Sequence, residues 1–343
     1  MSTMAMAVTT TPFRGILCNH SLQLPPKLSF SSHPFPLLHR HQPKSFQFSP
    51  KFPPTPITPF SATRSSLNSS KRNSHLAVVD DEDTTERKKL IQSVLWVMEG
   101  VYIVWLFLLP YAPGDPVWAI SSDTIKSLVG LSLNFFFILP IANYVGIHAM
   151  EAPVLHPTSE GLFNFVVGWT FMFAPLLYTD FKNNRYKGSL DVLWGLQMFL
   201  TNTFLIPYMA IRLNKADEST SPKKPSQLGT VMIKGAPVVG LIGGIVCAIS
   251  LLWSLYGRLD GDFGNVTDRW NFLLEYLGSE RLAYAFIWDI VLYMIFQPWL
   301  IGENLANIAE NKVELVKYIR YIPVVGLLAY LLCLKREVLE QLE

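Results

Sequence analysis

The sequence is poor in charge and in cysteine. Charged side chains make up only 16% of its 343 residues, whereas about 25% is usual in a soluble domain. The three cysteines are Cys18, Cys247 and Cys333, and the last two lie in apolar runs. Neither a disulfide framework nor a cysteine-based zinc site is therefore expected.

The motifs of nucleotide binding and of common hydrolases are also missing. The chain has no G-x-x-x-x-G-K-[ST], no G-x-G-x-x-G after a strand, no G-x-S-x-G and no H-E-x-x-H. Nucleotide-driven pumps and the usual serine or zinc hydrolases are excluded. The net charge of +2 does not indicate a nucleic-acid partner, because eight of the 28 basic residues lie in residues 1–79 and the other 20 stand against 26 acids.

Residues 1–79 contain no Asp or Glu but hold 20 Ser or Thr and 11 of the 24 prolines. A Ser-rich, acid-poor leader is typical of an organelle transit peptide. Its prolines prevent the long Arg-studded helix of a mitochondrial presequence, so the composition resembles that of chloroplast transit peptides. We expect a disordered leader over 1–79 that is removed in a plastid. An ordinary disordered tail is the alternative.

The rest of the chain is rich in long apolar runs. A bilayer core takes about 20 apolar residues as helix, so the pattern predicts an all-α, polytopic bundle of about seven transmembrane helices. The predicted spans are Leu90–Leu109, Ile125–Ile147, Leu162–Thr179, Ser189–Ile211, Ala236–Tyr256, Leu282–Ile301 and Tyr318–Leu334. The third and the seventh are short for a full crossing.

A polar stretch divides these spans. We expect a first membrane block of four helices over 80–211, a polar linker over 212–235 and a second block of three helices over 236–343. Within the second block, residues 303–317 have apolar side chains at helical spacing with charges between them. That pattern predicts an interfacial helix.

Three of the spans share the pattern Phe-x-x-Pro, ending at Pro110, Pro140 and Pro207. A proline inside a helix leaves a carbonyl without its partner, so the helix ends, kinks or opens there. Discontinuous helices mark substrate sites in transporters. Chance is the alternative for so short a pattern.

Glu99 and Asp289 each lie near the middle of an apolar span, and no Lys or Arg lies inside any span except at its ends, as Lys126 does. A central acid costs about 2.5–3.5 kcal/mol on insertion scales, so it usually faces the bundle interior. Without a basic partner it is protonated or holds a cation. We therefore expect proton or cation coupling at both acids, or a protonated acid that serves helix packing. The polar side chains expected to share their cavity are Asn134, Asn143, Asn202 and Gln297.

His148, Glu151 and His156 stand together after the second span. A His-Glu-His set can bind a metal, so a single metal or a pigment magnesium at His148 and Glu151 is one hypothesis. The spacing matches no known zinc motif, and a polar loop at the interface is the alternative. No cofactor is predicted.

The fifth span carries small residues at intervals of four: Ala236, Gly240, Gly244 and Ala248. Such a ladder allows close helix packing, either within the chain or with another protein.

Three functions fit these features of a multi-pass protein in the inner envelope or thylakoid. The first is transport of a small solute or lipophilic molecule with the buried carboxylates as titratable groups. The second is a non-catalytic scaffold or assembly factor that binds other plastid membrane proteins. The third is a membrane-embedded lipid or isoprenoid enzyme. In each case the lipid bilayer is the expected environment.

Overall fold

The computed structural model describes residues 70–215, 224–259, 261–335 and 338. Within these ranges the chain forms α-helices with short 3-10 and π turns and no β-strand; an isolated bridge pairs Ile308 with Leu334. The all-α prediction is confirmed for this part of the chain. Residues 1–69 of the predicted leader lie outside it, whereas residues 70–79, which were expected to be disordered, form the first turns of helix α1 (Ser70–Ile103).

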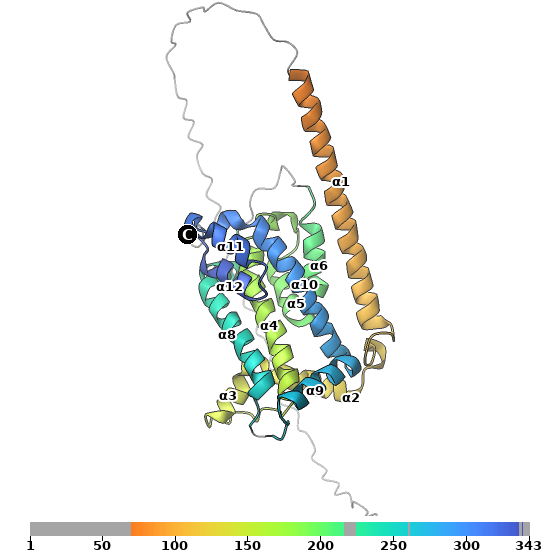
Figure 1. The fold of residues 1–343 in the computed structure, drawn as a ribbon, viewed down its shortest axis with the longest axis vertical. Coiled ribbons are helices and arrows are strands. Elements are labelled where there is room, and N and C mark those ends of the chain that lie inside the picture. Colours follow the sequence, from red (N-terminus) through yellow and green to blue (C-terminus); the bar gives the residue numbers. More distant parts are fainter. Residues whose placement is uncertain (1–69, 216–223, 260, 336–337, 339–343) are drawn as a thin grey trace, which may run out of the picture. The chain divides into compact units, whose positions relative to one another are not determined.

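Four helices are long and apolar enough to span a membrane (Figure 1). They are the segment Thr85–Leu108 of α1 and its π-helical extension, α4 (Pro157–Tyr178), α8 (Ala236–Tyr256) and α10 (Arg281–Glu303). These helices match the first, third, fifth and sixth predicted spans and indicate a membrane protein. The segments Ser122–Leu133 and Phe135–Tyr144 are bent by 43° relative to each other, and they are long enough for a fifth span only if they are counted as one helix. The expectation of seven spans is not confirmed.

The other helices are shorter. They are α2 (Ser122–Leu133), α3 (Ile138–Tyr144), α5 (Leu190–Leu200), α6 (Asn202–Ile211), α7 (Gln227–Lys234), α9 (Val266–Ser279), α11 (Val313–Ile319) and α12 (Val325–Leu332). Several start at a side-chain cap: Ser121, Ser189, Ser226 and Asn265 each accept a hydrogen bond from an amide in the first turn. Such caps satisfy amides that have no partner within the helix.

Helix α4 lies at the centre of the bundle and packs closely against α8. A Cβ atom added at Gly243 would lie 2.4 Å from Cγ of Met172 and 2.8 Å from the carbonyl oxygen of Gly168. Only glycine lets the two backbones approach this closely. The predicted small-residue ladder has a different neighbour. Ala236 is buried, Gly240 and Gly244 pack against Leu331 and Leu328 of α12, and Ala248 is exposed.

Contacts between helix ends define two ends of the bundle, which we name by residues of α10. At the Arg281 end, the guanidinium of Arg281 donates to the carbonyls of Leu106 and Leu109, where α1 stops. The end of α8 meets the start of α4 there, through Ser254 and Gly161. At the Glu303 end, the ends of α4, α6 and α10 meet (Figure 1). The four long helices therefore alternate in direction along the chain.

The second predicted span, Ile125–Ile147, lies along the Arg281 end. Thr124 near the start of α2 donates to Glu280, which precedes α10. Asn134 after α2 bonds to Glu160 in the first turn of α4, and α3 faces the last turns of α8 across a cavity. The break between the two helices contains Phe136 and Phe137 with φ of 52° and 57°. The start of α2, the break and α3 all have partners at this end, so the two helices lie across it, and the ring of Phe136 reaches deeper to Phe171 of α4.

The fourth predicted span, Ser189–Ile211, is a helical hairpin. Asp191 at the start of α5 accepts from Tyr178 at the end of α4, and Arg212 after α6 binds Asp180. Both outer ends of the hairpin thus lie at the Glu303 end. An 11-residue helix is about 16 Å long, roughly half of a hydrocarbon core, so α5 enters the bundle, turns at Thr201 and returns as α6.

The C-terminal segment also departs from prediction. Residues 303–317, expected as one interfacial helix, contain two 3-10 turns followed by α11. The seventh predicted span is broken by Val324, which has φ of 62°, and its last helix, α12, has only eight residues. The amide of Lys335 donates to Asn307, so the segment starts and finishes at the Glu303 end.

The predicted polar linker is only partly a linker. Residues 216–223 lie outside the described residues, but Arg212 is fully buried and residues 227–234 form α7. Helix α7 packs on α4, where Gly229 lies against the ring of Tyr178.

Candidate functional site

Asp289 of α10 is the centre of the site. The side chain is 2% exposed, and its Oδ1 accepts three hydrogen bonds. The donors are the Tyr102 hydroxyl at 3.0 Å, the Thr201 hydroxyl at 2.6 Å and the Asn202 amide at 2.7 Å. They come from α1 and from the tip of the α5–α6 hairpin. All three are uncharged, and no basic group of the described chain pairs with Asp289.

The hairpin tip is built around a strained residue. Thr201 has φ of 40° and ψ of −110°, a conformation that costs a residue with a side chain on the order of 1–3 kcal/mol. Its amide closes α5 by donating to the Gln197 carbonyl at 2.8 Å. The next residue, Asn202, opens α6. This geometry directs two consecutive side chains at the same carboxylate, which helps offset the cost of burying it.

Asp289 begins a row of buried polar side chains on α10, which continues at Tyr293 and Gln297. We call these three residues the α10 polar row. Residues four apart share a helix face, and all three are at most 2% exposed. The Tyr293 hydroxyl lies 2.5 Å from that of Thr170 on α4.

Gln297 is fully bonded and holds the C-terminal segment in place. Its Oε1 accepts from the Trp169 indole at 2.9 Å. Its Nε2 donates to the carbonyls of Arg320 and Ile322, each at 2.9 Å. Those carbonyls lie at the turn between α11 and α12. Helix α10 therefore contacts two turns: the tip of the α5–α6 hairpin through Asp289, and the α11–α12 turn through Gln297.

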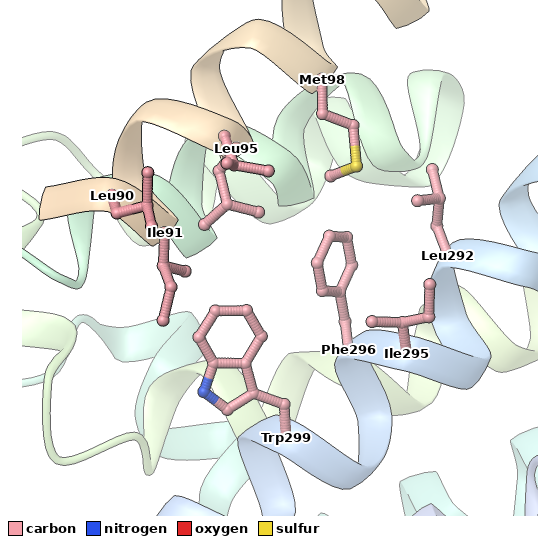
Figure 2. Close-up of a pocket in the computed structure, with 9 residues that line it drawn as sticks. Leu90, Ile91, Leu95, Met98, Leu292, Ile295, Phe296 and Trp299 are labelled. Atoms are coloured by element: carbon pink, nitrogen blue, oxygen red, sulfur yellow. The ribbon is translucent and has the colours of Figure 1, made fainter. Parts of the chain in front are cut away.

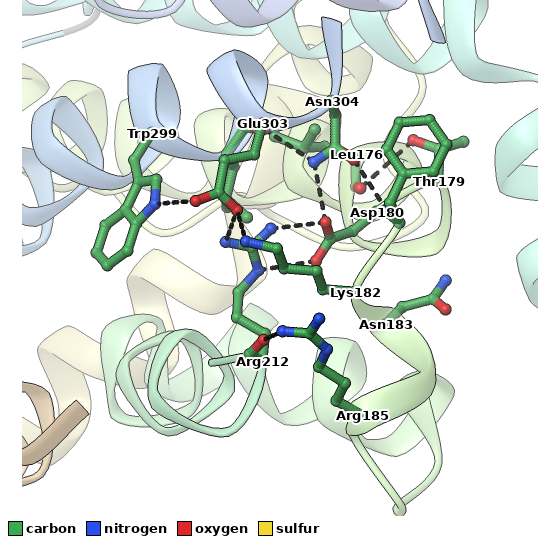
Figure 3. A network of polar contacts seen from close by, with 12 residues as sticks. Leu176, Thr179, Asp180, Lys182, Asn183, Arg185, Arg212, Trp299, Glu303 and Asn304 are labelled. Carbon is green, nitrogen blue, oxygen red and sulfur yellow. Dashed lines mark hydrogen bonds and ion pairs between the residues drawn. The ribbon is translucent and has the colours of Figure 1, made fainter. Parts of the chain in front are cut away.

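An ion-pair network joins helix ends at the Glu303 end (Figure 3). Arg212 binds both oxygens of Asp180, with Nε 2.9 Å from Oδ2 and Nη2 2.7 Å from Oδ1. Tyr208 and Asn304 also donate to this carboxylate. Burial raises the pKa of Asp180, but the hydrogen bonds and charge of Arg212 outweigh it and hold that pKa below its ordinary value. Asp180 therefore stays ionised.

Glu303 extends the network to α10. It accepts from Nη1 of Arg212 at 2.9 Å, from the Trp299 indole at 2.8 Å and from Lys182. Arg212 thus bridges an acid after α4 and an acid at the end of α10 (Figure 3). Although burial lowers the pKa of Arg212, its two acidic partners raise it overall.

A second network lies at the Arg281 end. Glu160, which is fully buried, accepts from Arg258 at 2.5 and 3.0 Å, from Asn134 at 2.5 Å and from Trp253 at 2.7 Å. It joins the start of α4 to the end of α8 and to the break between α2 and α3. Acids of this kind, each with an arginine, stand at both ends of α4.

Two cavities in the described part of the chain lie apart from Asp289. One, of about 270 Å³, is an apolar groove between α1 and α10, with Leu95, Met98 and Phe296 among its lining residues (Figure 2). The other, of about 740 Å³, lies between α3 and the end of α8, against Trp253 and Arg258. Neither is lined by Asp289, whose side chain is only 2% exposed and is therefore enclosed by protein.

The predicted polar side chains do not share one cavity. Asn202 contacts Asp289 and Gln297 lies two turns along α10, but Asn134 bonds to Glu160 at the Arg281 end. Asn143 ties down the loop after α3 through Ile147, Met150 and Ala152.

Glu99 faces the interior of the bundle. It is 6% exposed, and its Oε2 has no hydrogen-bond partner. It shares a stripe of α1 with Gln92, Leu95 and Tyr102, of which Gln92 bonds to α6 and Tyr102 to Asp289. Both predicted carboxylates thus point inward from different helices.

The three metal candidates lie in different environments. His148 and Glu151 are exposed. His156 caps α4 through Nδ1, which accepts from the Thr158 amide at 3.2 Å, and its ring stacks on Phe272 at 3.4 Å between centroids. In the described part of the chain, no three His, Cys, Asp or Glu side chains are grouped in a way that could hold a metal ion.

Of the three partners of Asp289, Asn202 was predicted from sequence, but Tyr102 and Thr201 were not. Tyr102 lies three residues after Glu99, and this spacing places both on one face of α1. Thr201 carries no sequence signal beyond its position before Pro207.

The chain matches no protein-family model, and comparisons with curated proteins and with solved structures found no significant match.

Proposed function

We propose that this chain is a transporter of a plastid membrane that moves a small solute or lipophilic molecule, with Asp289 as the coupling group. The observation that carries the proposal is the setting of Asp289. It is a buried carboxylate with uncharged donors only, at the tip of a re-entrant hairpin in a bundle of apolar helices.

The chemistry of that setting supports reversible ion binding. A buried carboxylate without a basic partner gains from taking up a proton or a cation, because either neutralises a charge that burial disfavours. Interrupted helices place such groups in secondary transporters. Backbone that is not helical is tolerated at membrane depth only when protein or a water-filled cavity surrounds it, and the tip at Thr201 is buried.

The scaffold alternative receives less support from the packing. Gly240 and Gly244 of the small-residue ladder contact α12 of the same chain, so they do not offer a surface to a partner. The enzyme alternative requires acids beside an open pocket, and neither cavity is lined by Glu99 or Asp289.

Plastid targeting rests on the leader. An acid-free, Ser- and Pro-rich segment over residues 1–79 supports import into a plastid, with the inner envelope or the thylakoid as the destination. Residues 1–80 fused to a fluorescent reporter should accumulate in plastids. A cytosolic or mitochondrial signal would refute this part of the proposal.

Transport is tested with the purified full chain in liposomes that contain a pH-sensitive and a potential-sensitive dye. Adding fractions of a plastid small-molecule extract should drive charge movement across wild-type membranes. The Asp289→Asn variant should lose this response, because an amide keeps the shape and the hydrogen bonds but cannot exchange a proton or balance a cation. A matched control is Asp268→Asn in α9, an exposed acid outside the site. An unchanged response in Asp289→Asn would reject the coupling role.

A further inference from the structure

Unpartnered polar atoms are frequent on α5, α6 and the facing part of α1. Ten buried side-chain N or O atoms of the described residues have no hydrogen-bond partner, and six of them lie on α1, α5 and α6. They are Oε2 of Glu99, Nε1 of Trp194, both amide atoms of Gln197, Oδ1 of Asn202 and Oγ1 of Thr203. Each such atom costs about 1–3 kcal/mol when nothing binds it, so a cluster of them requires an explanation.

Helix register places two members of this set, on α1 and α6, at the level of the hairpin tip. Helices α1 and α6 run antiparallel, with Gln92 bonded to the Ala210 carbonyl at 3.0 Å. Glu99 lies seven residues after Gln92 and Thr203 lies seven residues before Ala210, so in these antiparallel helices the two are at the same level. One turn deeper on α1, Tyr102 reaches Asp289, and Asn202 reaches the same carboxylate from α6.

Gln197 closes the set from α5. It is fully buried, its side chain lies beside Tyr293, and neither of its amide atoms makes a hydrogen bond of normal geometry. The Tyr293 hydroxyl is the neighbour within reach of this amide. A buried amide with so poor a set of partners is disfavoured in a core that serves packing alone. Helix α5 also ends here, so its last carbonyls have no amide further along the helix to bind.

We propose that the tip of the α5–α6 hairpin binds a sodium ion among oxygens of Asn202, Thr203, Gln197 and the carboxylate of Asp289. The inference rests on the proposed function and names its coupling ion. Carboxylate, amide and hydroxyl oxygens are the ligands that hard cations prefer, and broken helices coordinate Na⁺ through their C-terminal ends.

The total charge of the proposed ligand oxygens favours a monovalent ion. Asp289 is the one acid bonded to the tip, and the other oxygens there belong to neutral amides and hydroxyls. A single positive charge neutralises it. Divalent calcium usually takes six to eight oxygens with several carboxylates among them, and the described residues form no such cluster.

Thermal unfolding of the full chain in detergent tests this site. Sodium chloride is exchanged for choline chloride at constant ionic strength and pH, so that only specific binding raises the melting temperature. The wild-type chain should be stabilised by sodium in a saturable way. Asn202→Ala and Gln197→Leu should each raise the half-maximal sodium concentration by about tenfold or more, as expected when a ligand is lost.

Gln197→Leu separates ion binding from packing. If Gln197 were only an unsatisfied core residue, leucine would leave the sodium response intact and stabilise the protein, because an uncompensated polar group is removed. Gln297→Leu is the matched control: this amide is fully bonded, so its loss should lower the melting temperature while the sodium response persists.

Identical melting curves in sodium and choline would overturn the inference and leave buried water or a proton as the occupant of the tip. The liposome assay distinguishes this failure from failure of the proposed function. Charge movement that continues in sodium-free buffer and is lost in Asp289→Asn would retain transport and reject sodium. No charge movement in either buffer, or full movement in Asp289→Asn, would reject transport itself.

Discussion

Asp180 and Asp289 are equally buried, each 2% exposed, yet their partners differ. Asp180 is held by Nε and Nη2 of Arg212, together with Tyr208 and Asn304. Asp289 has only two hydroxyls and one amide. Both acids contact the α5–α6 hairpin, the first at its base and the second at its tip.

The comparison shows that the partner, rather than the depth, determines what a buried acid can do. A carboxylate paired with a bidentate arginine keeps its charge, and removing either partner leaves the other uncompensated. A carboxylate bonded to neutral donors can be neutralised by a proton or a cation without breaking an ion pair. Asp180 is thus suited to fixing the base of the hairpin, and Asp289 at its tip is suited to binding and releasing a proton or a cation.

The largest effect is expected for Arg212→Met. The substitution leaves Asp180 without its cationic partner, whereas Glu303 keeps Lys182. Breaking a buried ion pair in this way costs about 3–5 kcal/mol. The melting temperature in detergent should fall sharply. Adding Asp180→Asn to this variant should recover part of the loss, since the unpaired charge is then removed. Equal stability of Arg212→Met and the wild-type chain would contradict the assignment of this network as the clamp of the hairpin.

The next effect compares two neighbouring glycines of α8. Gly243→Leu would collide with Met172 and with the α4 backbone, whereas Gly244→Leu meets only the flexible end of Leu328 at 3.1 Å. Overpacking costs about 1–3 kcal/mol or more, so Gly243→Leu should reduce accumulation much more than Gly244→Leu. Immunoblots of membrane fractions would measure this, with substitutions in α7 as a reference. The reverse order would place the critical interface of α8 against α12.

A smaller effect is expected from His156, which lies outside the spanning segments. Burial, with a contribution from the charge of Arg269, lowers the pKa of His156 to about 4 from its ordinary 6.5. Between these values the unfolded chain binds a proton that the folded chain does not, so stability should decrease as the pH falls from 6.5 towards 4. His156→Asn keeps a capping acceptor and should flatten this part of the pH profile. An unchanged profile would show that the imidazole does not titrate as described.

The parts of the fold that sequence predicted well depend on length and composition alone. The runs that became α4, α8 and α10 are long, apolar and uninterrupted. The run Ser189–Ile211 is equally apolar, because a hairpin inside a bundle is surrounded by apolar side chains just as a spanning helix is. Periodicity therefore cannot separate the two, and only Pro207 hinted at a break, which occurs nearby at Thr201.

The candidate site was predictable in part for the same reason. Glu99 and Asp289 stand out because acids are rare in apolar runs, and both are buried. The Asp180–Arg212 pair was not found, since the two residues lie in polar stretches where charges are ordinary. The two residues meet because α6 returns to the Glu303 end, where α5 began, and no local sequence pattern encodes that return.

The most direct test compares Asp289→Asn with Asp180→Asn in one preparation, with thermal unfolding and liposome charge movement measured on the same protein. We expect Asp289→Asn to melt close to the wild-type temperature and to lose charge movement. Asp180→Asn should melt at a lower temperature, and its charge movement should fall only with the fraction of folded protein. The account would be contradicted if Asp289→Asn retained full charge movement, or if both variants lost stability and charge movement to the same extent.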